Sequence, residues 1–275
     1  MKIMIAGLGL IGGSMAKALK KAGISTDGFD REEVLSYALQ QGIIASFAQD
    51  ISDYDVVFVA LPPEATLSFI EENEFKQGAV VADICGVKGV IERAVMSKPR
   101  NFRYVGCHPM AGKEVSGIRN SEADLFKKAS MIVVENEYTD SEAEKVIVGL
   151  SRKMGFARIV RCSSSYHDAK IAYTSQLAHI VSNAYVKSPT AQGYSGFTGG
   201  SFQDMTRIAG VDEKLWAKLF ILNRDQITQE LSRLIGNLQK YQNALNKGEE
   251  EPLEALLREG RLQKERLDIE KDKKK

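Results

Sequence analysis

MKIMIAGLGLIGGSMAKALKKAGISTDGFD, residues 1–30, has the order strand, glycine turn, helix, strand and acidic residue. The apolar run 2–6 predicts the first strand. The Ala-, Lys- and Leu-rich segment 13–22 predicts a helix, which Gly23 would end. Residues 25–29 predict a second strand, and Asp30 follows it directly. This order is typical of the first βαβ unit of a doubly wound α/β domain.

The turn carries three glycines in the spacing G-x-G-x-x-G. Gly7 allows a tight turn, Gly9 lets the backbone approach a pyrophosphate, and Gly12 lets the helix pack close to the strand. The N–H groups at the helix start, at Leu10 and Ile11, favour a bound phosphate together with the helix dipole. Because the flanking strands and helix are all present, the segment predicts a dinucleotide site.

Asp30 lies 18 residues after Gly12, where a carboxylate can accept hydrogen bonds from a ribose 2′-OH. This placement favours NAD over NADP. Arg31 complicates the choice, because an arginine there could meet a 2′-phosphate or be a solvated residue at a helix start. We predict NAD as the cofactor, with a binding set of Gly7, Gly9, Leu10, Ile11, Gly12, Asp30 and Arg31.

Composition excludes several classes of partner. The chain has 275 residues, 44% of them hydrophobic, and a formal net charge of +1, which indicates neither nucleic acid nor an anionic membrane as partner. No apolar stretch reaches the roughly 18 residues of a membrane span. The three cysteines show neither metal-ligand spacing nor a disulfide pattern, so we expect no metal and a cytoplasmic location.

Strands and helices alternate up to about Cys162. Apolar runs at 54–61 and 79–83 are typical of strands buried on both faces of a parallel sheet, and a further strand at 103–107 precedes His108. Strand, helix and strand are expected again at 131–134, 141–154 and 158–160. We therefore predict a Rossmann-type doubly wound parallel sheet in a domain of residues 1–162.

Residues 163–275 predict a second domain that is all α-helical. Helical periodicity covers 166–186, a Gly/Ser/Thr-rich loop follows at 190–200, and an apolar stripe at helical spacing runs over 213–245 as one long helix. The segments 254–258 and 261–271 predict a further charged helix. The stripe suits an intramolecular core, and it also suits packing against a second subunit, which we favour.

His108 is the strongest candidate for a catalytic group. It follows a predicted strand, and ligands of open α/β sheets bind outside the carboxyl ends of strands. A neutral imidazole there could accept a hydroxyl proton during loss of a hydride. The alternative role is to cap the next turn. His179, on a predicted helix, is equally a buried structural histidine or a site residue, and His167 is expected to cap a helix or lie on the surface.

Arg207 follows a glycine pair and several polar residues. A guanidinium in such a segment can bind a carboxylate through two parallel hydrogen bonds. An ion pair with Asp204, three residues earlier, is the simpler alternative and is slightly favoured when Arg207 is considered alone.

Four blocks together resemble the prephenate dehydrogenase family: GLGLIGGS at 7–14, HPMAG at 108–112, SQLAH at 175–179 and DMTRIA at 204–209, with Trp216 beyond them. Their order and spacing match over about residues 1–245. The glycine block is shared by many dehydrogenases, whereas the histidine-proline block combined with the helical-domain blocks is much more specific.

The resemblance implies NAD-linked oxidative decarboxylation of prephenate to 4-hydroxyphenylpyruvate, on the route to tyrosine. It implies that His108 accepts the substrate's hydroxyl proton, that Arg207 holds a carboxylate and that His179 orients the substrate. Prephenate is a dianion, so a neutral protein needs a local positive site, to which Lys113 or Lys88 could add. The resemblance also implies a homodimer formed through the helical domain.

The chain departs from the family's pattern near the expected substrate. Gly86 stands where the family often has a serine, Gln176 and Ala178 replace a histidine and a proline, and Gln203 stands where a lysine is common. These changes remove positive charge and leave open whether the substrate is prephenate or arogenate, which carries an additional ammonium group.

Two further alternatives stay open. One is another Rossmann dehydrogenase with a helical dimerisation domain, such as a β-hydroxyacid dehydrogenase, for which Lys170 would be the candidate lysine on the interdomain helix. The other is a non-catalytic sensor of NAD. Such a sensor needs no proton acceptor, and His108 argues against it.

Overall fold

The computed structural model describes residues 1–113 and 115–273, with side chains described up to Ile269. Residues 274 and 275, the end of the predicted second domain, lie outside that range. The chain falls into two compact units, Met1–Arg224 and Asp225–Lys275. The predicted domain boundary after residue 162 differs from this division and stays a prediction.

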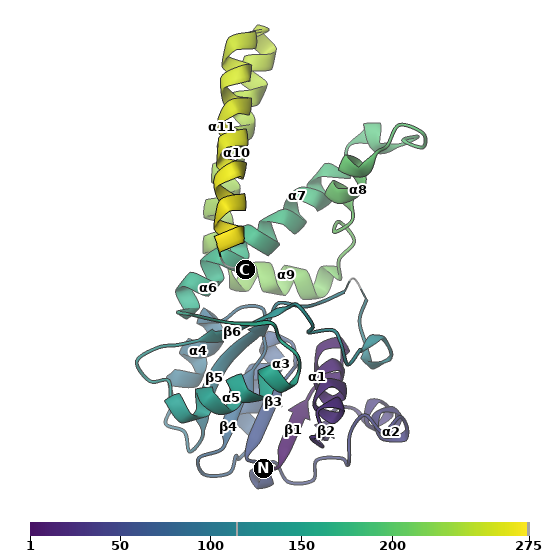
Figure 1. Ribbon diagram of the computed structural model, residues 1–275, viewed down its shortest axis with the longest axis vertical. Helices are drawn as coiled ribbons and strands as arrows, with labels where there is room; N and C mark the ends of the chain where they lie inside the picture. Colours follow the sequence, from purple (N-terminus) through teal and green to yellow (C-terminus); the bar gives the residue numbers. More distant parts are fainter. Residues whose placement is uncertain (114, 274–275) are drawn as a thin grey trace. The chain divides into compact units, whose positions relative to one another are not determined.

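The first unit contains one seven-stranded sheet in the order β2-β1-β3-β4-β5-β6-β7 (Figure 1). Its strands are β1 Ile3–Ala6, β2 Asp27–Phe29, β3 Val56–Val59, β4 Val80–Asp83, β5 Arg103–Pro109, β6 Ser130–Val134 and β7 Arg158–Cys162. From β1 the chain goes first to β2 on one side and then to β3 on the other, so the direction of strand addition reverses at β1. A crevice at the carboxyl ends of such a pair is where open α/β sheets bind ligands.

The helices around the sheet cover both of its faces, so the predicted Rossmann-type fold is confirmed (Figure 1). They are α1 Leu10–Lys21, α2 Glu32–Gln40, α3 Pro63–Glu72, α4 Gly89–Met96 and α5 Ser141–Lys153. Successive residues of a strand point to opposite faces. Accordingly Ile3 and Ile5 belong to one buried apolar cluster, and Met4 and Ala6 belong to the other.

The sheet is mixed rather than wholly parallel. β5 pairs with β6 in the antiparallel sense, and all other strand pairs are parallel. A parallel neighbour requires a crossover, usually through a long helix. Among the described residues between β5 and β6, the one helical element is a short 3₁₀ helix, Ile118–Asn120, and β6 runs in the opposite direction to β5.

After β7 the described chain forms helices only. They are α6 Ser164–Ile171, α7 Leu177–Tyr185, α8 Gly200–Thr206, α9 Glu213–Leu222, α10 Arg224–Lys247 and α11 Glu250–Lys273. α6 and α7 are joined by a π-helical turn, Ala172–Gln176, a form that often occurs at functional sites. No helix in the described ranges combines the length and the apolarity needed to span a bilayer.

The single long helix predicted over 213–245 is wrong, because the chain breaks at Asn223. There the backbone leaves helical geometry, with φ −119° and ψ 22°. The buried Asn223 amide donates to the Asp168 carbonyl at 2.9 Å and to Gln176 Oε1 at 2.6 Å. These two tertiary hydrogen bonds hold the end of α9 against α6 and the π-helical turn.

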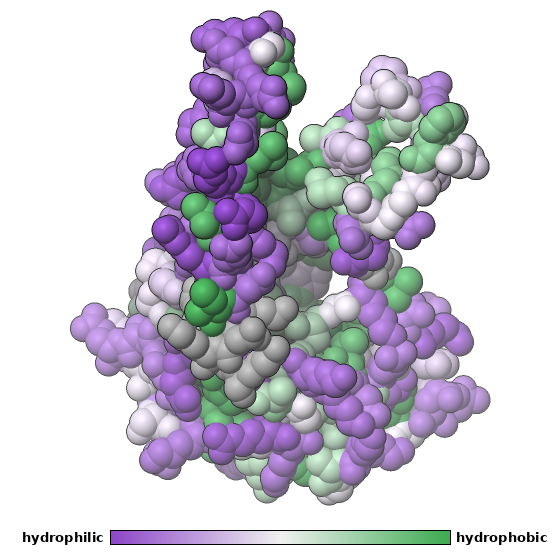
Figure 2. Space-filling view, turned by 45° about the horizontal axis from the view of Figure 1, so that its top comes forward, coloured by the Kyte–Doolittle hydropathy of each residue, from purple (hydrophilic) through white to green (hydrophobic). Residues whose placement is uncertain are grey.

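The second unit is a pair of helices, α10 and α11. Gly248, with φ +69°, ends α10 and allows the chain to reverse, and the Tyr241 hydroxyl donates to the Leu256 carbonyl at 3.2 Å. Hydrophilic side chains cover most of the visible face of this pair, with apolar ones along one edge (Figure 2). The charged helix predicted from 254–258 and 261–271 is α11, which begins earlier and continues through residues 259 and 260.

Candidate active site

The glycine turn lies between β1 and α1, next to the end of β3. A Cβ on Gly7 would lie 2.4 Å from the Ala60 carbonyl oxygen, and a Cβ on Gly12 would lie 1.8 Å from that of Gly7. The fold itself therefore requires these two glycines. A Cβ on Gly9 would meet no protein atom within 4 Å. The protein alone gives no reason for a glycine there, whereas a ligand lying close to the backbone does.

Asp30 stands beside this turn, as predicted. Its Oδ2 accepts a hydrogen bond from Leu8 N at 2.6 Å, and its Oδ1 accepts one from Arg31 N at 2.7 Å. The carboxylate is therefore fixed at the end of β2 and bound to the backbone of Leu8, the residue before Gly9. The Arg31 side chain is 84% exposed and its Nε lies 4.0 Å from Asp30 Oδ1. The binding of a ribose by these two residues stays a prediction.

His108 lies inside β5 rather than after it, paired in register with Ile132 of β6. Its Nδ1 lies 2.8 Å from Nε2 of His167. A Cβ added to Gly86 would lie 3.7 Å from His108 Nε2, so the other ring nitrogen faces the segment that follows β4. Burial, then His167 and Lys88, lower the pKa of His108 well below its ordinary value of 6.5, and the ring is neutral at pH 7.

His167 is a site residue that the sequence analysis missed. Its predicted role as a capping or surface residue is wrong, because the side chain is fully buried and its Nδ1 lies 2.7 Å from Asp168 Oδ1. The contact between His108 and His167 spans 59 positions. The scarcity of histidine, with three in the chain, is the one signal in the sequence that could have drawn attention to it.

Lys88 is not available to a substrate, contrary to the suggestion from the sequence. Its ammonium group is fully buried, forms an ion pair with Asp83 and donates to the Cys107 carbonyl at 2.6 Å. The Tyr104 hydroxyl donates to the other oxygen of Asp83 at 2.6 Å. A buried ammonium requires such partners. Lys88 therefore links Asp83 of β4 to Cys107 of β5, the residue before His108.

The other predicted substrate groups lie on separate elements. His179 of α7 stacks on Trp216 of α9, with ring centroids 3.9 Å apart, and its Nδ1 donates to the Ser175 carbonyl at 2.9 Å. Lys113 forms an ion pair with Glu122 at 2.5 Å. Arg207 is exposed at the end of α8, which is held to α7 by the Ser182 hydroxyl donating to the Met205 carbonyl. The approach of these three side chains to His108 stays a prediction.

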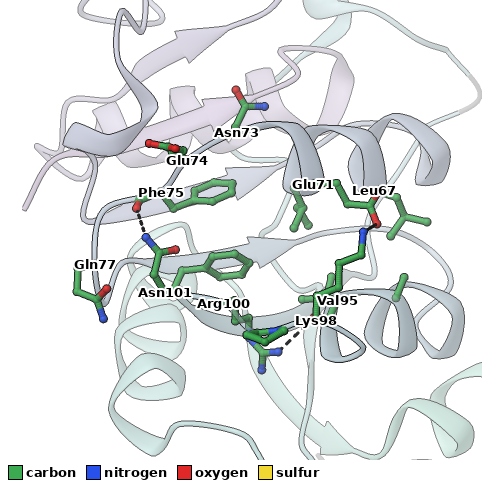
Figure 3. A pocket seen from close by; sticks show the side chains of 14 residues that line it. Leu67, Glu71, Asn73, Glu74, Phe75, Gln77, Val95, Lys98, Arg100 and Asn101 are labelled. Carbon is green, nitrogen blue, oxygen red and sulfur yellow. Dashed lines mark hydrogen bonds and ion pairs between the residues drawn. The ribbon is translucent and has the colours of Figure 1, made fainter.

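A cavity of about 730 Å³ lies elsewhere, at the amino ends of β4 and β5 (Figure 3). Phe75, Gln77 and Asn101 line it, together with the ends of α3 and α4. None of the predicted site residues belongs to its lining. Within residues 1–113 and 115–273, no three His, Cys, Asp or Glu side chains are grouped as a metal ion requires.

Comparison with known proteins places this geometry in a family. The sequence model of the prephenate dehydrogenase nucleotide-binding domain matches residues 15–160, and that of the prephenate dehydrogenase dimerization domain matches residues 163–259. The chain belongs to the prephenate dehydrogenase family.

Relatives within the prephenate dehydrogenase family differ in their named substrates. The chain is 30% identical to a prephenate dehydrogenase of Bacillus subtilis, with 91% of this chain and 72% of the relative covered. It is 27% identical to a cyclohexadienyl dehydrogenase of Zymomonas mobilis, with 88% of each covered.

A solved structure of similar shape is that of prephenate dehydrogenase from A. aeolicus in complex with hydroxyphenyl propionate and NAD+. Its TM-score is 0.86 at 26% identity, over 97% of this chain and 98% of that one. An arogenate dehydrogenase of Synechocystis, 24% identical with a TM-score of 0.82 over 97% of this chain and 100% of that one, shares the fold.

The contrast between Gly9 and Gly12 gives a test of the dinucleotide site. Gly9→Ala is expected to change the free energy of unfolding by less than about 1 kcal/mol, because the added methyl group meets no protein atom. It should still weaken binding of NAD, the cofactor that the sequence predicts. Gly12→Ala should destabilise the fold by about 1–3 kcal/mol, because the methyl group overlaps the Gly7 carbonyl. Urea unfolding and calorimetric titration with NAD measure the two effects, and unchanged affinity in Gly9→Ala would contradict the site.

Proposed function

We propose that this protein catalyses the NAD-dependent oxidative decarboxylation of prephenate to 4-hydroxyphenylpyruvate, a step of tyrosine biosynthesis. The observation that carries the proposal is the neutral, partly buried His108 at the carboxyl end of the sheet, in a chain of this family. The solved structure of the A. aeolicus prephenate dehydrogenase, a complex with NAD+, supports the choice of cofactor. NAD would supply the acceptor for the hydride that leaves the substrate ring.

The protein's own groups have separate tasks in this reaction. We infer that His108 accepts the proton of the ring hydroxyl at Nε2 as the hydride leaves. Loss of carbon dioxide from the opposite ring carbon then completes aromatisation. Arg207 binds a substrate carboxylate, His179 orients the ring, and Lys113 adds positive charge. Gly9 and Asp30, with the other residues of the glycine turn and Arg31, hold the dinucleotide.

Arogenate is the second candidate substrate. Gln176, at a position where many family members carry a histidine, is buried and accepts a hydrogen bond from Asn223. Lys88 is neutralised by Asp83. Both observations reduce the positive charge available to a second carboxylate, which favours a substrate that carries an ammonium group of its own.

Rates with the two substrates test the proposal. Purified protein with NAD is expected to form NADH faster from prephenate than from arogenate, with a lower rate when NADP replaces NAD. His108→Asn should lower kcat about 10²–10⁴-fold, because the proton acceptor is lost while the fold is kept. NADH formation from arogenate but not prephenate would replace the first proposal by the second. Unchanged turnover of His108→Asn would remove His108 from the mechanism.

The role of Arg207 is tested by its neutral variant. Arg207→Gln should lower kcat/KM for prephenate about 10–100-fold, because a charge-assisted hydrogen bond to a carboxylate is lost. Arg207→Lys should recover only part of the loss, since lysine cannot form the two parallel hydrogen bonds. Arg233→Gln, which breaks a surface ion pair with Glu230 on α10, is the matched control. Equal kinetics in Arg207→Gln and the control would contradict the assignment.

We also propose a homodimer formed through the helical region, which the family's dimerization domain matches over residues 163–259. Large apolar side chains are exposed on both helices of the second unit, among them Ile235, Leu238 and Leu257. Sedimentation velocity should give twice the mass of one chain, and Leu238→Lys should shift the species toward monomer. A wild-type mass of one chain across the accessible concentration range would contradict the proposal.

A further inference from the structure

Behind His108 the structure holds a continuous chain of hydrogen bonds. His108 Nδ1 lies 2.8 Å from His167 Nε2, and His167 Nδ1 lies 2.7 Å from Asp168 Oδ1. Asp168 also accepts the backbone N–H of Lys88 at 2.9 Å and that of Gly89 at 2.8 Å. One carboxylate is thus fixed at the start of α4, with two imidazoles in line between it and the candidate site.

The direction of each hydrogen bond follows from the acid at the end of the chain. Burial raises the pKa of Asp168, but the hydrogen bonds from His167, Lys88 and Gly89 outweigh this effect and lower it. Asp168 is therefore an ionised acceptor, so His167 Nδ1 carries the proton and its Nε2 can accept from His108. In this direction His108 donates from Nδ1 and keeps its lone pair on Nε2, the nitrogen facing Gly86.

We propose that His167 and Asp168 form a relay that holds His108 in the tautomer with a basic Nε2 and receives its Nδ1 proton during catalysis. This inference rests on the proposed function and specifies how its base is prepared. The hydroxyl O–H bond of the substrate breaks and an N–H bond forms at His108 Nε2. The Nδ1–H proton of His108 passes to His167 Nε2, and the positive charge comes to rest on the ring beside Asp168.

The surrounding charges favour this end point. The charged groups that face the two rings are Lys88, from the segment before α4, and Asp168, from α6; Lys88 is itself paired with Asp83 of β4. The Lys88 ammonium opposes a positive charge on His108. A cation on His167 contacts Asp168 directly. His167 and Asp168 act through His108 and are positioning residues.

The tautomers can be observed without any substrate. The chain has three histidines, so a protein labelled with ¹⁵N in its imidazole rings gives three pairs of ring signals, assigned with His108→Asn and His167→Gln. At pH 7 we expect His108 to be neutral, and both His108 and His167 to carry a proton at Nδ1. His179, which donates from Nδ1 to Ser175, serves as an internal reference. Protonation of His108 at Nε2 in place of Nδ1 would overturn the relay, whatever the enzyme's activity.

Kinetics test the second part of the proposal. Asp168→Asn keeps an acceptor oxygen but removes the charge, so kcat/KM should fall about 10–100-fold. The acid limb of its pH profile, which we expect below pH 6.5 in the wild type, should also move to lower pH, because the protonated pair loses its anion. Loss of structure alone would lower the profile without moving the limb.

Asp140→Asn is the matched control, because Asp140 caps α5 in the same way by accepting from Ala143 N at 2.8 Å. It should leave the limb in place. An unmoved limb in Asp168→Asn would overturn the relay while leaving the proposed reaction intact. If neither prephenate nor arogenate is oxidised, the proposed function fails. The ¹⁵N signals of the imidazole rings then decide by themselves whether His108 and His167 carry their protons at Nδ1.

Discussion

The carboxylate of Asp168 connects α6, which carries His167, to the start of α4. It belongs to α6, after the last strand of the sheet, yet it accepts the first backbone N–H groups of α4. A helix start offers several donors that lack a partner within the helix, so a buried anion there is stabilised. The same residue anchors His167. One carboxylate therefore joins α6 to the start of α4 and, through His167, reaches the ring of His108.

The proposed cofactor site and the proposed catalytic base are built in different ways. The glycine turn, the helix start and Asp30 come from residues 1–30, and local backbone geometry brings them together. The residues around the proposed base come from β4, β5 and α6. Lys88, which is paired with Asp83, donates to the carbonyl of Cys107, the residue before His108. Local rules produce the first part, whereas the second exists only once the sheet has closed.

Sequence reasoning succeeded where a pattern repeats and failed where one long-range contact decides. Buried strands such as β3 and β4 lie where continuous apolar runs predicted them. The break at Asn223 escaped prediction because the apolar stripe continues through it, and its cause is a pair of hydrogen bonds to Asp168 and Gln176. The antiparallel turn into β6 was missed because strand periodicity carries no information about direction.

The sequence by itself determined the βαβ unit, the alternation of strands and helices, the family blocks and the choice of His108, because each depends on residues that are neighbours along the chain. Only the tertiary structure decided that the buried His167 contacts His108 and that Lys88 forms an ion pair with Asp83. Those contacts join segments whose proximity follows from packing of the whole unit. A side chain's charge state and partner depend on what surrounds it in space, and spacing along the chain does not contain that.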